Sequence, residues 1–211
     1  MDESSEISGL LRRAAEGDVQ AIDALFARYE TRLKRMVRLR MNRTLSARVD
    51  VSDVLQDAYV VVAKSLAEYL RNPSLPFFLW LRHITGQKLI EIHRRHLGAQ
   101  ARDAGRDVLL GGAAGPEATS ENLAAQLIGR LSSPSSAAQK AELRARVQAA
   151  LDGLDPIDRE ILSLRHFEQL SNVETAALLG LAVPSASSRY VRALKRLKSA
   201  LKGVAGLFDS S

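Results

Sequence analysis

The chain has 211 residues, of which 30 are Lys or Arg and 24 are Asp or Glu, so its formal net charge is +6. It contains no cysteine, which excludes a disulfide framework, thiolate-bound zinc, iron–sulfur clusters and thiol catalysis. Aromatic residues make up only 5%, and this composition favours helices over an all-β fold. The excess of positive charge favours a polyanionic partner, but a net charge of +6 does not establish one by itself. The distribution of the basic residues along the chain has to show whether such a partner is bound.

Neither a targeting segment nor a membrane span is evident in the sequence. The first residues, MDESSEIS, are acidic and lack the basic and then apolar layout of a signal peptide. The longest apolar clusters, such as Val60–Ala63, are far shorter than a membrane-spanning helix. We therefore expect a cytoplasmic protein with no membrane insertion.

The N-terminal part, residues 1–98, is predicted to be one helical domain. Apolar residues recur at three- and four-residue steps over residues 7–43 and 52–70, which indicates amphipathic helices. Gly17 and Asp18 predict a break between a short first helix and a long second one. The first domain ends with a short loop, predicted from Pro73 and Pro76, and a helix from about Phe77 to His96.

A second helical domain, residues 139–211, is expected after a flexible tether. Residues 99–138 are then rich in Ala, Gly and Ser, with a weak helix expected around 121–131 within this tether. The fold class is therefore all-α, with two small domains joined by the tether.

A helix-turn-helix is predicted in the C-terminal domain. Ser171 and Glu174 form a capping box, and Gly180 suits the end of the short helix that it opens. Pro184 starts a second helix that reaches roughly Lys202 and carries no acid. Small polar residues in its first turn permit close approach to base edges, and later cations suit phosphates. The alternative is a solvated basic helix in an ordinary bundle.

Three further clusters leave two explanations open. The basic run over residues 28–48 suits either nucleic acid or a solvated helix face with salt bridges. The acids between Asp50 and Asp57 suit either helix capping, which periodicity favours, or docking of a basic partner. The segment 76–96 interleaves aromatics with cations, which suits stacking on unpaired bases, although we expect Phe77 or Trp80 to be core.

No catalytic motif is present. The sequence has no HExxH, no GxxxxGK[ST] and no GxSxG. His93 and His96 have the spacing of a metal pair, and the alternative that they suggest is a metal-dependent hydrolase that uses them or His83. We expect no enzyme activity, no cofactor and no metal.

Three motifs in this order resemble the extracytoplasmic-function (ECF) group of bacterial RNA polymerase sigma factors. They are Asp53-Val54-Leu55-Gln56-Asp57; Phe77-x-x-Trp80-Leu81-x-x-Ile84 followed by Leu89-Ile90-Glu91 and Arg94-Arg95; and Glu174-x-Ala176-x-x-Leu179-Gly180 followed by Ser188-Arg189 and Lys195-Arg196-Leu197. Together they span both predicted domains, which would be sigma regions 2 and 4.

The resemblance implies three sets of site residues. The set that docks on the clamp helices of the largest polymerase subunit is Asp50, Asp53, Gln56 and Asp57. The set that binds and melts the −10 element is Asn72, Phe77, Trp80, Arg82, Lys88, Arg94 and Arg95. The set that binds the −35 element is Ser185, Ser187, Ser188, Arg189, Arg192, Lys195 and Arg196.

The implied function is that of a sigma factor. It would bind core RNA polymerase, direct it to specific promoters and assist promoter opening, with an anti-sigma factor as a further partner. The alternative is a helix-turn-helix transcription regulator that never docks on polymerase. Loss of polymerase binding on substitution of Asp53 and Asp57, with folding intact, would separate the two.

Overall fold

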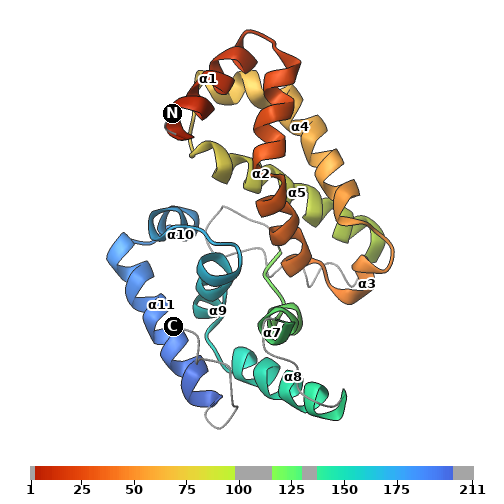
Figure 1. The fold of residues 1–211 in the computed structure, drawn as a ribbon, viewed down its shortest axis with the longest axis vertical. Helices are drawn as coiled ribbons and strands as arrows, with labels where there is room; N and C mark the ends of the chain where they lie inside the picture. Colours follow the sequence, from red (N-terminus) through yellow and green to blue (C-terminus); the bar gives the residue numbers. More distant parts are fainter. Residues whose placement is uncertain (1–2, 98–115, 130–136, 202–211) are drawn as a thin grey trace. The chain divides into compact units, whose positions relative to one another are not determined.

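The computed structural model describes residues 3–97, 116–129 and 137–201, and every regular element within those ranges is helical (Figure 1). The chain divides into two compact units. The first holds α1 (Glu3–Ala15), most of α2 (Val19–Arg40), α3 (Arg43–Ser46), α4 (Val51–Arg71) and α5 (Phe77–Leu97). The second holds α7 (Ser120–Gly129), α8 (Ala137–Asp152), α9 (Pro156–Leu162), the π-helix η2 (Ser163–Phe167), α10 (Asn172–Leu179) and α11 (Val183–Ala200). The predicted all-α fold is confirmed.

The break between α1 and α2 lies where the sequence predicts it. Gly17 adopts φ +87°, a left-handed conformation that a side chain disfavours, and it ends α1. The Asp18 carboxylate then accepts a hydrogen bond from the Ala21 amide at 3.2 Å, which satisfies a free donor of the first turn of α2.

The first unit is a bundle of amphipathic helices around one apolar core. Helices α2 and α4 each contribute one face to it, whereas α5 is buried over most of its circumference, and the fully buried side chains include Leu33, Val54 and Leu81. The loop between α4 and α5 is held by Tyr69, whose hydroxyl donates to the Leu75 carbonyl at 2.8 Å. This loop therefore has a fixed place next to the start of α5.

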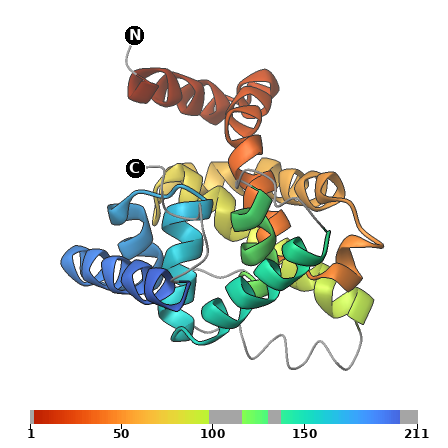
Figure 2. The ribbon, with the colours of Figure 1, turned by 60° about the horizontal axis from the view of Figure 1, so that its bottom comes forward.

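The second unit packs two helix layers on a shared core. Helices α7 and α8 lie side by side in Figures 1 and 2, and so do α10 and α11. The core joins α7, α8, α9, η2 and α11, and its fully buried members include Leu123, Leu151 and Ala193. Residues 39–42, at the end of α2, also belong to this unit.

Helix α7 lies inside the range that the sequence analysis assigns to the tether, near the weak helix expected around residues 121–131. Its Leu123 and Ala124 are completely buried in the core of the second unit. This part of the range is therefore packed. Residues 99–115 and 130–136 of the predicted tether lie outside the described residues, and its last two residues begin α8. The domain limits at residues 98 and 139 stay a prediction.

Candidate nucleic-acid interface

The helix-turn-helix is formed by α10 and α11. The Ser171 hydroxyl accepts a hydrogen bond from the Glu174 amide at 3.1 Å, and the Glu174 carboxylate accepts one from the Ser171 amide at 2.7 Å. Gly180 ends α10 in the left-handed conformation, with φ +62°. The predicted capping box and helix end are therefore confirmed, and they fix the turn that leads into α11.

The first turns of α11 present small side chains to solvent. Asn172 of α10 donates its amide to the Val183 carbonyl at 3.0 Å, which ties the start of α11 to α10. Ser185, Ser187 and Ser188 are all exposed. A shallow hollow on this surface is lined by Pro184, Ser185, Ser187, Ser188, Arg189, Val191 and Arg192. The N-terminal half of α11 is thus open to a ligand along its outer side.

The four cations of α11 that the resemblance assigns to DNA form two groups. Arg192 and Lys195 are exposed, and no described residue forms an ion pair with either. Arg189 instead donates to Asp158 at 2.9 Å, and Arg196 donates to Asp155 at 3.2 Å. Two of the four cations that the resemblance assigns to DNA are therefore held by acids of the α9 segment. The sequence analysis missed these acids as partners because they lie 31 and 41 positions away in the chain.

The acids at the start of α4 include a second capping box. The Asp50 carboxylate accepts from the Ser52 amide at 2.6 Å, and the Asp53 carboxylate accepts from the Asp50 amide at 3.2 Å. The hydrogen bonds from Ser52, with Arg38 and Lys34 at longer range, hold the pKa of Asp50 below its ordinary value. The capping explanation therefore holds for Asp50 and Asp53.

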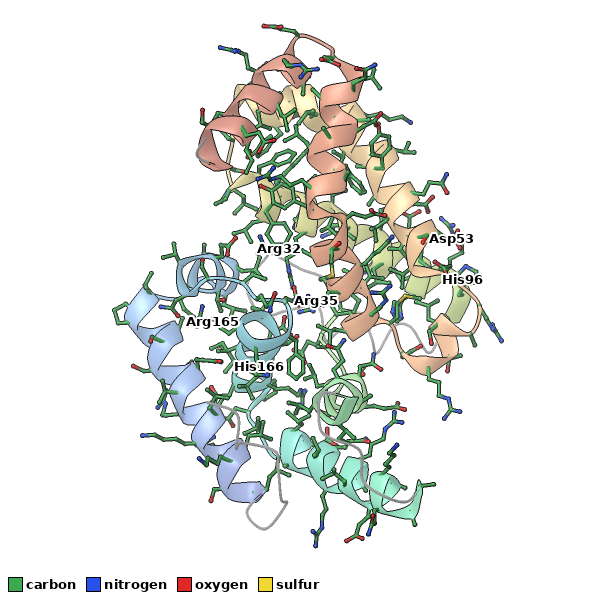
Figure 3. All side chains as sticks on the ribbon, viewed as in Figure 1. Arg32, Arg35, Asp53, His96, Arg165 and His166 are labelled. Carbon is green, nitrogen blue, oxygen red and sulfur yellow. The ribbon has the colours of Figure 1, made fainter. Side chains whose placement is uncertain are left out.

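Capping leaves an acidic surface on the same helix. Asp53, Gln56 and Asp57 are all exposed, and Figure 3 shows Asp53 on the outer side of α4. One oxygen of the Asp53 carboxylate caps the helix, and its second oxygen accepts no hydrogen bond from another described residue. A basic partner would meet these groups without rearrangement of the helix.

An aromatic cluster joins α4, α5 and the loop between them. The Tyr69 and Trp80 rings stack with their centroids 4.4 Å apart, and Phe77 lies 5.7 Å from Trp80. Phe77 is only 8% exposed, whereas Trp80 is partly exposed. Asn72 is exposed, and its amide closes the end of α4. Of the two aromatics expected to bind DNA, one is thus a core residue, as anticipated for at least one of them.

The cations of α5 differ from one another in exposure and pairing. Arg82 is 2% exposed and lies within the bundle. Lys88 and Arg95 both pair with Glu91, at 2.7 and 2.9 Å. Arg94 is exposed and forms no ion pair with a described residue. Burial removes Arg82 from the surface on which the resemblance places it.

The basic run over residues 28–48 is largely engaged within the protein. Arg28 pairs with Glu6 at 2.9 Å, Lys34 pairs with Glu30 at 2.7 Å, and the Arg32 guanidinium lies 3.6 Å from the centre of the Phe78 ring. Arg40 is buried in the second unit, where it donates to Glu160 and Glu168. These contacts favour the salt-bridged helix face over a nucleic-acid surface.

The described residues offer no further chemistry at this interface. Within residues 3–97, 116–129 and 137–201, no group of three His, Cys, Asp or Glu side chains is placed to hold a metal ion. In the same ranges, every long helix is too polar to span a lipid bilayer.

Comparison with known proteins gives a consistent family. Residues 144–197 match the family model for region 4 of sigma-70. The chain is 31% identical over 202 residues to the ECF RNA polymerase sigma factor ShbA of Streptomyces griseus, over 94% of this chain and 96% of the relative. It is 32% identical over 196 residues to the RNA polymerase sigma factor CnrH of Cupriavidus metallidurans, over 91% of this chain and 92% of the relative.

A solved structure agrees with the sequence comparison. The structure of CnrH in complex with the cytosolic domain of CnrY matches with a TM-score of 0.52 and 28% identity, over 91% of this chain and 94% of that one. The matches extend over almost the whole length of both proteins, and the region 4 match contains the helix-turn-helix described above. The chain belongs to the ECF family of RNA polymerase sigma factors, which direct transcription initiation.

Proposed function

We propose that this sigma factor reads the −35 element with the N-terminal half of α11. The observation that carries the proposal is the exposed row Ser185, Ser187 and Ser188, which lines one hollow with Arg192, a cation that no described acid pairs with. Recognition helices contact base edges with their first turns, and small side chains let the backbone approach closely. Arg192 supplies the fork of donors that suits guanine or phosphate, and Lys195 lies one turn further on to reach a phosphate.

We assign binding of the −10 element to the surface of the first unit around the loop between α4 and α5. The partly exposed Trp80, backed by Tyr69 at 4.4 Å, offers a ring on which an unpaired base can stack. Asn72 lies exposed at the end of α4, at the start of the same loop. Arg94, which pairs with no described acid, supplies a cation for the phosphate backbone. Phe77 supports this surface from within, and Lys88 and Arg95 contribute after release from Glu91.

Core polymerase is assigned to the acidic surface of α4. Asp53, Gln56 and Asp57 lie at helical spacings of three and four, so they share one side of the helix. Asp50 acts mainly as the helix cap, because its carboxylate is bound to the Ser52 amide. We assign the clamp helices of the largest subunit as the partner, with Asp57 as the carboxylate most available to them.

The two DNA surfaces act as linked weak binders. Each is a small surface with few unpaired cations, so each alone binds promoter DNA poorly. A tether between them sets their effective concentration on two promoter elements a fixed distance apart.

An anti-sigma factor is a further partner in this proposal. The relative CnrH has been solved in complex with the cytosolic domain of CnrY, and its structure matches over 91% of this chain. A protein that covered the acidic surface of α4 would block polymerase docking. Competition between such a protein and core polymerase for the same Asp57 would support this assignment.

Run-off transcription tests the proposal as a whole. Purified chain and core RNA polymerase are combined over a promoter library, and transcripts are sequenced. We expect transcripts that depend on the chain and share −10 and −35 motifs. Absence of any chain-dependent transcript with active core would overturn the proposal.

A substitution tests the docking surface. Asp57→Asn should lower the affinity for core polymerase, while the folded protein keeps its melting temperature. Glu142→Gln, at an exposed position on α8, removes the same charge elsewhere and serves as the control.

A further inference from the structure

A buried carboxylate links the recognition helix to the helix that supports it. Asp158 lies in the first turn of α9, and only 3% of its surface is exposed. Its neighbour Asp155, at the cap position of α9, makes no side-chain hydrogen bond to the helix. Both carboxylates instead face arginines of α11. An acid near a helix N-terminus is ordinary, but a buried one with two cations on another helix is not explained by helix capping.

The ion pairs fasten α11 at two points. Arg189 donates to one oxygen of Asp158 at 2.9 Å, and Arg196 lies 3.6 Å from the other oxygen. Arg196 also donates to Asp155 at 3.2 Å. Seven residues make about two helical turns, so Arg189 and Arg196 lie on nearly the same side of α11, roughly 10 Å apart along its axis. One buried carboxylate therefore contacts two successive parts of one helix face.

The buried face of α11 beside this link is made of small side chains. Ala186 and Ala193 are completely buried and each presents only a methyl group, while the larger Leu197 is buried further along the helix. Methyl groups interlock less than large side chains, so the part of α11 around Arg189 depends more on the ion pairs for its position. A rotation of about 20° would move a side chain at the rim of a helix, about 5–6 Å from its axis, by ~2 Å. That displacement is enough to lose a hydrogen bond to a base edge.

We propose that Asp158 is a positioning residue for promoter recognition, and that Arg189 acts by holding α11 in register on α9 rather than by binding DNA. This rests on the proposed −35 role of α11. The pair fixes the direction in which Ser185, Ser188 and Arg192 face. It also removes Arg189 from the set of cations that neutralise DNA phosphates.

The opposite arrangement makes a different prediction. If Arg189 bound DNA, Asp158 would compete with the promoter for it, and neutralising Asp158 would strengthen DNA binding. If Asp158 positions α11, neutralising it weakens DNA binding. The two arrangements therefore differ in the sign of one measured effect.

The experiment measures promoter affinity of the reconstituted holoenzyme over a series of salt concentrations. The DNA is a promoter fragment selected by run-off transcription, together with the same fragment carrying a scrambled −35 element. The variants are Asp158→Asn, Arg189→Gln, their combination, and Arg192→Gln as the matched control from the same helix. Thermal unfolding followed by circular dichroism confirms that each variant is folded.

We expect Asp158→Asn and Arg189→Gln each to weaken binding roughly tenfold, within the range that loss of one base contact costs. The double variant should be no weaker than either single one, because both break the same link. The slope of log affinity against log salt should stay that of the wild type for these variants. For Arg192→Gln it should become shallower by about one contact.

Two results would overturn the inference. One is tighter promoter binding by Asp158→Asn, and the other is a shallower salt slope for Arg189→Gln. If Asp158→Asn fails to fold, the slope of Arg189→Gln decides alone. Failure of the −35 role itself has a separate signature, because the scrambled −35 fragment would then bind wild-type holoenzyme as tightly as the intact one.

Discussion

The basic helices α5 and α11 hold their cations in different ways. In α5, Lys88 and Arg95 share Glu91, a neighbour three and four residues away on the same helix. In α11, Arg189 and Arg196 find their acids on another helix, and one of those acids is buried. The pairs of α5 are local, exposed and easily exchanged for a phosphate. Those of α11 are tertiary, so they define where the helix lies.

The exposed cations of the two helices differ in where they lie. Arg94 of α5 and Arg192 of α11 are both exposed and unpaired by described residues. Arg94 lies near the C-terminal end of its helix, whereas Arg192 borders the hollow of the recognition surface. We therefore expect Arg94 to contribute affinity and Arg192 to contribute sequence preference as well.

The largest expected effect is at Arg192. Arg192→Ala should weaken binding of the holoenzyme to its selected promoter by about 1–3 kcal/mol, the cost of a base contact, and should reduce discrimination at one position of the −35 element. Competition binding against promoters altered at single positions measures both. A uniform loss across all these promoters would instead make Arg192 a phosphate contact.

The second prediction compares the two acids directly. Asp158→Ala should lower the free energy of unfolding by about 2 kcal/mol, since hydrogen bonds to charged groups contribute roughly 1.5–3 kcal/mol. Glu91→Ala should change it much less, because its pairs are local and exposed. Urea denaturation of the full chain measures both values. Equal losses would show that the tertiary pair is no stronger than the local ones.

This contrast also marks what the sequence could predict. The capping box at Ser171, the break at Gly17 and the end at Gly180 all follow from local chemistry, and the structure confirms them. Helix capping, the favoured explanation for the acids around Asp50, takes the form of a second capping box. Glu91 pairs at helical spacing with Lys88, a contact of the same local kind. Local rules act within one turn or one helix, and they suffice for the elements.

Contacts between distant segments were not available to the sequence analysis. Nothing in the pattern around Arg189 indicates that Asp158 meets it, and Arg82 gives no local sign of its burial. The π-helix Ser163–Phe167 and the turn that follows it were not predicted either, and Gln169 in that turn adopts φ +59°, a conformation that non-glycine residues rarely take. Burial and partner choice depend on packing, which periodicity does not specify.

The third prediction concerns the release of local pairs on α5. Glu91→Gln should free Lys88 and Arg95 for DNA and strengthen promoter binding a few-fold, whereas Arg94→Gln should make the salt slope shallower by ~0.9 for a duplex phosphate. Salt titrations of holoenzyme on one promoter measure both. If Glu91→Gln leaves the affinity unchanged, Lys88 and Arg95 do not contact the promoter.

The smallest effect is a pH dependence that belongs to Glu91. The hydrogen bond from Lys88, its charge and the charge of Arg95 hold the pKa of Glu91 below its ordinary value of 4.5. A carboxyl whose pKa is lower in the folded state stabilises the fold above its unfolded pKa, and this contribution is lost as the pH falls through the folded value. Wild type should therefore lose more stability below pH 4.5 than Glu91→Gln does, while the difference between the two stays constant from pH 7 to pH 5.

Urea denaturation of the two proteins over this pH range measures the difference. Asp18 and Asp50 also have lowered pKa values, but both proteins carry them, so their contribution cancels in the comparison. A difference that stays constant down to pH 3 would mean that Lys88 and Arg95 stabilise the charged form of Glu91 no more than water does in the unfolded chain. The local ion pairs of α5 would then contribute nothing to the stability of the protein.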